Sequence, residues 1–198
     1  SDKPIDYKSV VYMQPKLDGV RCLIQCNPRK MVIAYSRNGK VWKNIDHILN
    51  TLIPFFAEHP DVVLDGELYN HDFKDDFESI ISMVRKTKPT DEDRYISAQN
   101  VQFHCYDIID TSKTYEQRRN FIVQNLPICD CINGVFTQLV SSEEEAKQFH
   151  KHSLELGYEG SIVRINDVYK CGRSWSLRKF KDFHDAEANI VGYEEGKG

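Results

Sequence analysis

Short apolar runs bounded by turn residues follow one another near the start of the chain. Residues 10–13, 21–26 and 31–36 are mostly apolar and extended in pattern, which predicts three strands. Residues 27–30, Asn-Pro-Arg-Lys, predict the hairpin connection between the second and third of them. The chain therefore opens with a small antiparallel sheet.

The next apolar positions change to helical spacing. Residues 46–58 predict a helix that Asp46 caps and that Pro54 kinks or ends. The same spacing predicts a second helix over 73–86. The polar stretch 87–95 contains a proline and predicts a surface loop.

The remainder of the chain mixes strands and helices without a regular strand-helix alternation. Helices are expected at 115–125, where Arg118 and Arg119 are expected on a solvated face, and at 142–156, which opens with a capping-box pattern. This mixture predicts an α+β domain of antiparallel sheets flanked by helices. Strands are expected at 62–64, 101–109, 136–140, 161–165 and 177–180, with a further strand beginning near 188–193.

Composition narrows the class of protein. The 198 residues suffice for one large or two small domains, and 40% hydrophobic with 28% charged residues is typical of a globular chain. A net charge of −4 argues against a protein that coats nucleic acid, although a local basic face is possible. The six cysteines and the histidines lack metal-ligand spacing, so we expect reduced thiols and no zinc site. Basic residues cluster late in the chain and form a candidate anion-binding surface: Lys170, Arg173, Arg178, Lys179 and Lys181.

Lys16 is the first candidate for chemistry. It follows the first strand and Pro15, and it precedes the turn signal Asp18-Gly19 and then Arg21. A lysine becomes a nucleophile when its ammonium loses its proton, which desolvation and neighbouring cations promote. By itself, this pattern also fits a solvated lysine before an ordinary hairpin turn.

Five further clusters follow in order, and each has an ordinary structural interpretation of its own. Ser36-Arg37-Asn38-Gly39 is a turn, Asp65-Gly66-Glu67 follows a buried-type strand, and Tyr106 directly precedes Asp107 in the strand expected at 101–109. Glu159-Gly160 precedes another strand. Strand geometry places Lys179 and Lys181 on one face and Phe180 on the other, so two ammonium groups could hold one phosphate.

Taken together, these clusters resemble motifs I, Ia, III, IIIa, IV and V of the covalent nucleotidyltransferases, which include ATP-dependent DNA ligases, RNA ligases and mRNA-capping guanylyltransferases. The resemblance covers residues 16–181. It implies a nucleotidyltransferase (ATP-grasp-like) domain over residues 1–188. Residues 189–198 resemble the linker into a C-terminal OB-fold domain that this chain does not contain.

The resemblance also implies a role for each candidate residue. Lys16 attacks ATP and carries AMP, while Gln14, Pro15 and Leu17 border the nucleotide, Gln14 at the adenine edge. Glu67 accepts a hydrogen bond from the ribose, Tyr106 stacks on the purine, and Lys179 and Lys181 hold the α-phosphate. Glu159, with Glu67, is expected to bind Mg²⁺ or Mn²⁺. Arg21 is expected to contact both nucleotide and nick, and Ser36 and Arg37 the nucleic-acid backbone.

The favoured interpretation is a viral or phage-like ATP-dependent DNA ligase that seals nicked double-stranded DNA as a monomer. We expect it in the cytoplasm of a host cell, or in the nucleus if it is eukaryotic, and away from membranes. Without an OB-fold domain, we expect adenylation and sealing from free ATP to be weak. An RNA ligase is the main alternative; a GTP-dependent capping enzyme and a catalytically silent nick-binding module are less favoured.

Overall fold

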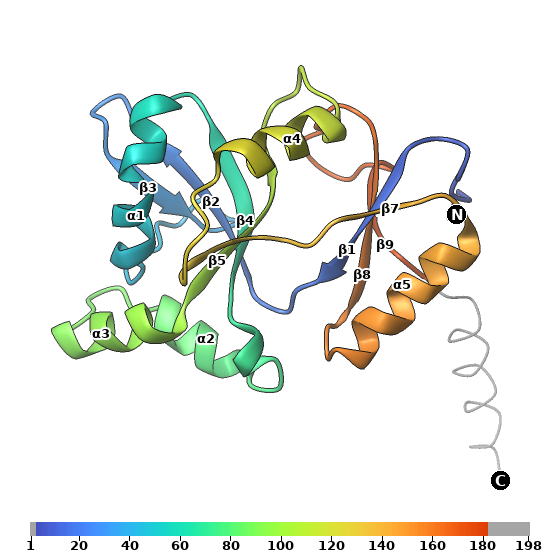
Figure 1. The fold of residues 1–198 in the computed structure, drawn as a ribbon. Coiled ribbons are helices and arrows are strands. Elements are labelled where there is room, and N and C mark those ends of the chain that lie inside the picture. Colours follow the sequence, from blue (N-terminus) through green and yellow to red (C-terminus); the bar gives the residue numbers. More distant parts are fainter. Residues whose placement is uncertain (1–2, 182–198) are drawn as a thin grey trace, which may run out of the picture.

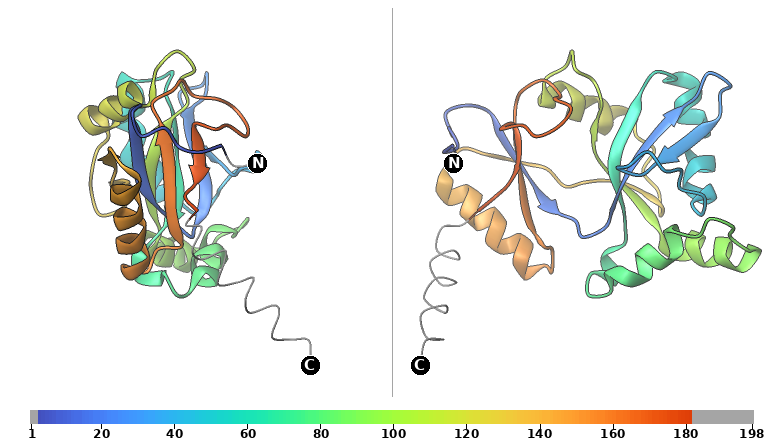
Figure 2. Two further views of the ribbon diagram at one scale, coloured as in Figure 1. Left: turned by 90° about the vertical axis from the view of Figure 1, so that its right-hand side faces the viewer. Right: turned by 180° about the vertical axis from the view of Figure 1, so that it is seen from behind.

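The computed structural model describes residues 3–181, and within them two β-sheets lie side by side, each with helices on its outer face (Figure 1). The chain begins in one sheet, crosses to the other after its first strand, and returns through the link that follows Gly134 (Figures 1 and 2). The α+β class with mostly antiparallel sheets is confirmed. No helix in residues 3–181 is long and apolar enough to cross a membrane.

The smaller sheet has the strand order β7-β1-β8-β9, and all of its pairs are antiparallel. Its outer face packs on α5, Glu143–Glu155, where Met13, Val163 and Phe149 share one core. Gly157, at a φ of +88°, follows the end of that helix, where a left-handed conformation favours glycine. Its strands are β1 (Val11–Lys16), β7 (Gln138–Val140), β8 (Gly160–Ile165) and β9 (Leu177–Lys179).

The larger sheet has the order β3-β2-β4-β5-β6, antiparallel except for the parallel pair β5–β6. It holds the main hydrophobic core against α1 and α4, with Ile48, Phe56 and Ile122 among the buried side chains. Its strands are β2 (Val20–Cys26), β3 (Val32–Tyr35), β4 (Val63–Tyr69), β5 (Gln102–Ile108) and β6 (Ile132–Gly134). Its helices are α1 (Asp46–Glu58), the 3₁₀ turn η1 (His71–Phe73), α2 (Phe77–Val84), α3 (Asp91–Asn100) and α4 (Tyr115–Asn125).

The predicted loop at 87–95 is wrong, because α3 begins at Asp91. Thr90 accepts from the backbone N–H of Asp93, and the Asp93 carboxylate accepts from that of Thr90, a reciprocal cap that satisfies two backbone donors. Since α3 buries little apolar surface, hydrophobic spacing could not reveal it. The capping pair Thr90 and Asp93 was the sequence signal that could have revealed α3.

Three boundaries also differ from the prediction. Asp46 is the first residue of α1 rather than its cap, since Ile45 occupies the cap position without a side-chain bond. The helix continues past Pro54 to Glu58 because Phe55 and Phe56 are buried in the core. The second predicted helix is split into η1 and α2, since Asp76 caps a new start at Phe77. Strand β6 had no prediction, and the predicted strand at 188–193 lies outside the described residues.

Gly66 in β4 offers a first test of the packing. A Cβ there would lie 2.3 Å from the His104 carbonyl oxygen and 2.6 Å from the Phe103 ring, so backbone or core must shift. We expect Gly66→Ala to lower the free energy of unfolding by about 2–4 kcal/mol in urea denaturation. Gly134→Ala in β6 of the same sheet is the matched control, since nothing lies within 4 Å of its Cβ. Equal stability of the two variants would contradict the close approach.

Candidate active site

Lys16 lies at the end of β1, where the chain leaves the smaller sheet. In the register of β1 and β8 it faces Gly160, and the Glu159 backbone N–H donates to the Lys16 carbonyl oxygen at 3.2 Å. The Lys16 Nζ forms an ion pair with the Glu159 carboxylate, and the two side chains are 20% and 44% exposed. Strand pairing thus brings motifs I and IV together across 143 residues and leaves both groups open to a ligand.

Glu67 and Tyr106 meet on the larger sheet. The pairing of β4 and β5 shifts at Asp65/Gly66, so Asp65 faces Asp107, Gly66 faces Cys105, and Tyr106 is left as an extra residue. Such a bulge redirects a side chain. The Tyr106 hydroxyl donates to Glu67 Oε2 at 3.2 Å. Burial raises the pKa of Glu67 to about 7, although the Tyr106 hydrogen bond opposes the shift.

Arg21 is the second residue of β2 and lies opposite Glu67 in the strand register. Its Nε and Nη2 each donate to the Asp65 carboxylate at 3.0 Å, and Nη2 also contacts the Tyr169 hydroxyl at 3.1 Å. The hydrogen bonds to Asp65 raise the pKa of Arg21, despite burial. The structure therefore places Arg21 in a fixed pair next to Glu67, and its contact with a nick stays a prediction.

Ser36 and Arg37 lie in the turn after β3, the edge strand of the larger sheet. The Ser36 hydroxyl accepts from the Lys40 backbone N–H at 3.1 Å, while Gly39 adopts a φ of +78°. The serine hydroxyl therefore supports the turn, and the exposed Arg37 is presented at its tip. In the described part of the chain, no hydrogen bond or ion pair joins this turn to Lys16, so it forms a separate part of the candidate site.

Lys179 belongs to β9 and pairs with Ile162 of β8. Phe180 packs into the α5 core, which puts the flanking Lys179 and Lys181 on the other face, as predicted. The hollow beside β9 has a volume of about 590 Å³. We call it the basic hollow; its polar lining consists of Lys3, Lys147, Arg173, Arg178, Lys179 and Lys181 with the single acid Glu143. Lys170 instead pairs with Asp167.

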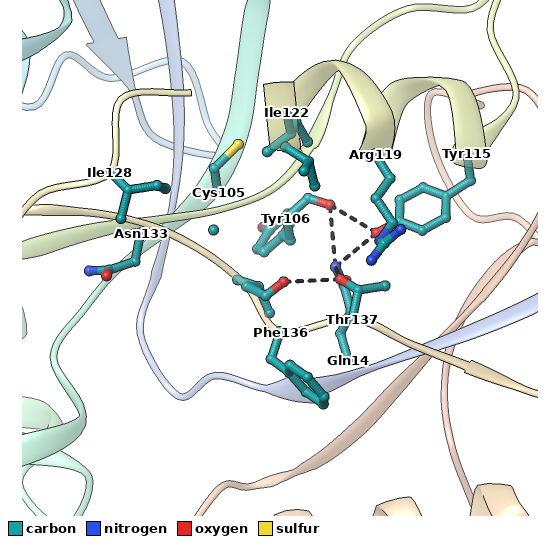
Figure 3. Close-up of a pocket in the computed structure, with 13 residues that line it drawn as sticks. Gln14, Cys105, Tyr106, Tyr115, Arg119, Ile122, Ile128, Asn133, Phe136 and Thr137 are labelled. Atoms are coloured by element: carbon teal, nitrogen blue, oxygen red, sulfur yellow. Dashed lines mark hydrogen bonds between the residues drawn. The ribbon is translucent and has the colours of Figure 1, made fainter. Parts of the chain in front are cut away.

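A second hollow, of about 420 Å³, lies between α4, β5 and the link that returns to the smaller sheet (Figure 3). Gln14 and Tyr106 both line it, together with Arg119, Phe136 and other residues of α4 and that link. Gln14 is only 2% exposed, and its amide donates to the Tyr115 hydroxyl at 2.9 Å and to Thr137 at 3.0 Å. Pro15 is buried and Leu17 half-buried beside it.

The fold and the site were compared with known proteins. A family model described as "ATP dependent DNA ligase domain" matches residues 5–181. The chain belongs to this family.

Named relatives agree with the family. The DNA ligase of Enterobacteria phage T6 is 27% identical over an alignment that covers 93% of this chain and 47% of the phage protein. The DNA ligase of African swine fever virus (isolate Tick/South Africa/Pretoriuskop Pr4/1996) is 29% identical, with 93% and 45% covered. A Chlorella virus DNA ligase-adenylate structure shares the fold, with a TM-score of 0.64 at 21% identity and 89% and 62% covered. The ligase domain described here spans about half the length of the curated relatives it matches.

The ligase domain also contains a buried ionic cluster that the sequence did not reveal. Asp107 accepts from Arg118 Nε at 2.7 Å and from Arg164 Nη1 at 2.8 Å, and all three side chains are almost fully buried. The predicted solvated position of Arg118 is therefore wrong, because the buried Asp107 draws it inward. The available signal for Arg164 was a charged residue inside an otherwise apolar strand.

Metal binding by the ligase domain stays a prediction. Of the two carboxylates expected to bind Mg²⁺, Glu67 lies in β4 and contacts Tyr106, while Glu159 directly precedes β8 of the other sheet and contacts Lys16. Within residues 3–181, no three His, Cys, Asp or Glu side chains are grouped so that they could hold an ion. Oxygen ligands of this number suit Mg²⁺ only together with phosphate oxygens and water.

The buried His104 of β5 should make the stability of the domain depend on pH. Burial, and less strongly the nearby His71, lower its pKa to about 4 from the ordinary 6.5. Between these two values the unfolded chain binds a proton that the folded domain does not, so stability is full above pH 6.5 and falls toward pH 4. Between pH 7.5 and 4.5, we expect the free energy of unfolding to fall by on the order of 1–3 kcal/mol less in His104→Gln than in the wild type. Urea denaturation of both proteins at the two pH values measures this difference. Identical pH profiles for the two proteins would contradict the burial effect.

Proposed function

We propose that this chain is the adenylyltransferase domain of an ATP-dependent DNA ligase, with Lys16 as the nucleophile. The observation that carries the proposal is the position of Lys16 within the matched family region. Lys16 stands at the end of β1 and is partly enclosed, and Glu159 pairs with its amine. The strand of Lys179, β9, lies on the far side of β8 from β1. A half-buried lysine that a ligand can reach suits covalent catalysis.

In the proposed first step, the Lys16 ammonium first gives one proton to the Glu159 carboxylate that it contacts, or to water. The neutral Nζ then attacks the α-phosphorus of ATP: a phosphorus–nitrogen bond forms, the bond to pyrophosphate breaks, and a second proton leaves the nitrogen to water. Lys179 and Lys181 stabilise charge on the phosphate, and a divalent cation at Glu159 and Glu67 would neutralise charge on the triphosphate.

In the later steps, AMP moves to the 5′-phosphate of a nick, and the 3′-hydroxyl displaces it. Ser36, Arg37 and Arg21 are proposed to contact the broken strand. We further propose that the working protein is a monomer with a C-terminal OB-fold domain beyond residue 188. Its expected location is the cytoplasm of an infected cell or a nucleus, where nicks from replication, repair or recombination are its substrates.

Intact-protein mass spectrometry tests the proposal. The 198-residue chain is incubated with Mg²⁺ and either ATP or GTP, alone and with an OB-fold domain from a ligase supplied in trans or by fusion. A mass gain of one AMP with ATP, absent with GTP, is the expected result. Nicked duplexes with DNA or RNA strands then separate the DNA ligase from the RNA ligase alternative. No adduct even with the OB-fold domain would overturn the proposed chemistry.

We expect duplex DNA to bind the ligase domain at the basic hollow. Lys147 lines the hollow and Lys151 does not, although both lie on α5 and each pairs with a glutamate four residues away. We expect Lys147→Gln to weaken binding of a nicked duplex several-fold and to reduce the slope of log K against log salt by about 1. Lys151→Gln is the matched control and should change neither. Equal effects of the two variants would place the DNA elsewhere.

A further inference from the structure

Arg164 of β8 connects the two residues expected to contact the base. Its side chain is 4% exposed, and its Nε donates to Gln14 Oε1 at 2.6 Å. Its guanidinium carbon also lies 5.2 Å from the centre of the Tyr106 ring. A second nitrogen binds Asp107, which holds the guanidinium in place. A single buried cation thus contacts both Gln14 and Tyr106.

Gln14 is placed to face the same ligand as Lys16. The two residues are two positions apart on β1, so they share one face of the strand, about 7 Å apart along it. The neighbouring strand puts Ile162 opposite Gln14 and Gly160 opposite Lys16. A nucleotide whose phosphate reaches Lys16 therefore has its base within reach of Gln14.

Arg164 fixes the orientation of the Gln14 amide group. A guanidinium has only donors, so the amide atom that contacts it has to be the oxygen. The two hydrogens of the amide nitrogen are then directed at Tyr115 and Thr137, whose hydroxyl groups accept them (Figure 3). Within residues 3–181, Oε1 accepts only the Arg164 hydrogen bond while the amide nitrogen is fully engaged, so Gln14 can offer a base an acceptor but no donor.

We propose that Arg164 is a positioning residue for base selection: by fixing the Gln14 amide with its oxygen available, it makes the domain prefer a purine with a 6-amino group over one with a 6-oxo group. The Gln14 oxygen can accept a hydrogen bond from a 6-amino group. Against a 6-oxo group it forms none, because the lone pairs of two oxygen atoms face each other. This inference rests on the proposed use of a nucleotide by this site.

Equilibrium binding separates the inference from the lysine chemistry. Dissociation constants of ATP and inosine triphosphate are measured with the 198-residue chain, because the two nucleotides differ at the 6-position and in the associated N1 proton. The ratio of the two constants is the readout, and a general loss of folding does not change it selectively. We expect the wild-type chain to prefer ATP.

Arg164→Met should lower this preference by roughly tenfold or more, since the amide is then free to turn, and Arg164→Lys should restore part of it. Gln14→Met should abolish the preference. Arg118→Met is the matched control, because it removes the other buried arginine from the same Asp107 carboxylate. Within residues 3–181, Arg118 packs on Tyr115 and Tyr169 and bonds neither Gln14 nor Tyr106. This variant should keep the wild-type ratio despite a similar loss of stability.

Three outcomes would overturn the inference. Arg164→Met could keep the full preference while Gln14→Met loses it, which would mean that Gln14 needs no orientation. Arg118→Met could lose as much as Arg164→Met, which would reduce both arginines to structural support. The wild-type chain could bind both nucleotides equally. Failure of the wild-type chain to bind either nucleotide would instead remove the proposed function, on which the inference depends.

Discussion

Lys16→Ala is expected to abolish covalent AMP on this domain while leaving the fold intact. The amine at the end of β1 is the proposed attacking group. The Lys16 side chain is 20% exposed and its partner Glu159 is 44% exposed, so water can solvate the carboxylate that loses the ion pair. We therefore expect the free energy of unfolding to change by less than about 1 kcal/mol.

The measurement is the gain of one AMP in intact mass, with the OB-fold domain supplied if the chain alone reacts slowly. Lys16→Arg keeps the positive charge but stays protonated, so it should also fail to react. Lys8→Ala removes an exposed lysine before β1 and is the matched control that should react as wild type. An AMP adduct on Lys16→Ala would assign the nucleophile to another residue, which peptide mapping would identify.

The parts of the site that the sequence predicted well are those set by neighbours along the chain. Lys16 and Glu159 each stand at or beside a strand end, and apolar runs with Asp-Gly or Glu-Gly punctuation mark these ends locally. Glu67, expected after the strand at 62–64, lies instead inside β4, which continues to Tyr69 between two paired neighbours. The alternation on β9 likewise placed Phe180 in the core and its flanking lysines outside.

What the sequence could not predict depends on partners far apart in the chain. Arg164 meets Asp107 across 57 residues and Gln14 across 150, and no local window shows which charges will meet. Arg118 looks like any solvated residue of a polar helix until the fold turns it toward Asp107. The bulge that redirects Tyr106 is also a property of strand register, which the sequence of one strand does not contain.

Asp107→Ala is expected to have the largest effect on stability. Within residues 3–181, Asp107 is the one carboxylate that pairs with Arg118 and Arg164, so its removal leaves two nearly fully buried guanidinium groups without compensation. Breaking a buried ion pair by removing one partner costs about 3–5 kcal/mol. With two arginines affected, we expect a loss at the upper end of that range in urea denaturation. Asp110→Ala removes a more exposed carboxylate three residues away and should cost about 1 kcal/mol or less.

A triple variant decides why Asp107 matters. Asp107→Leu combined with Arg118→Met and Arg164→Met removes all three buried charges at once, and apolar replacements of buried ion pairs are often neutral or stabilising. We therefore expect the triple variant to recover most of the stability that Asp107→Ala loses. It should not recover the preference for ATP over inosine triphosphate, because Gln14 no longer has a donor to orient it. If the triple variant recovers both stability and the ATP preference, the cluster of Asp107, Arg118 and Arg164 serves the fold alone. If it recovers neither, the packing shape of these side chains, rather than their charge balance, holds the two sheets together.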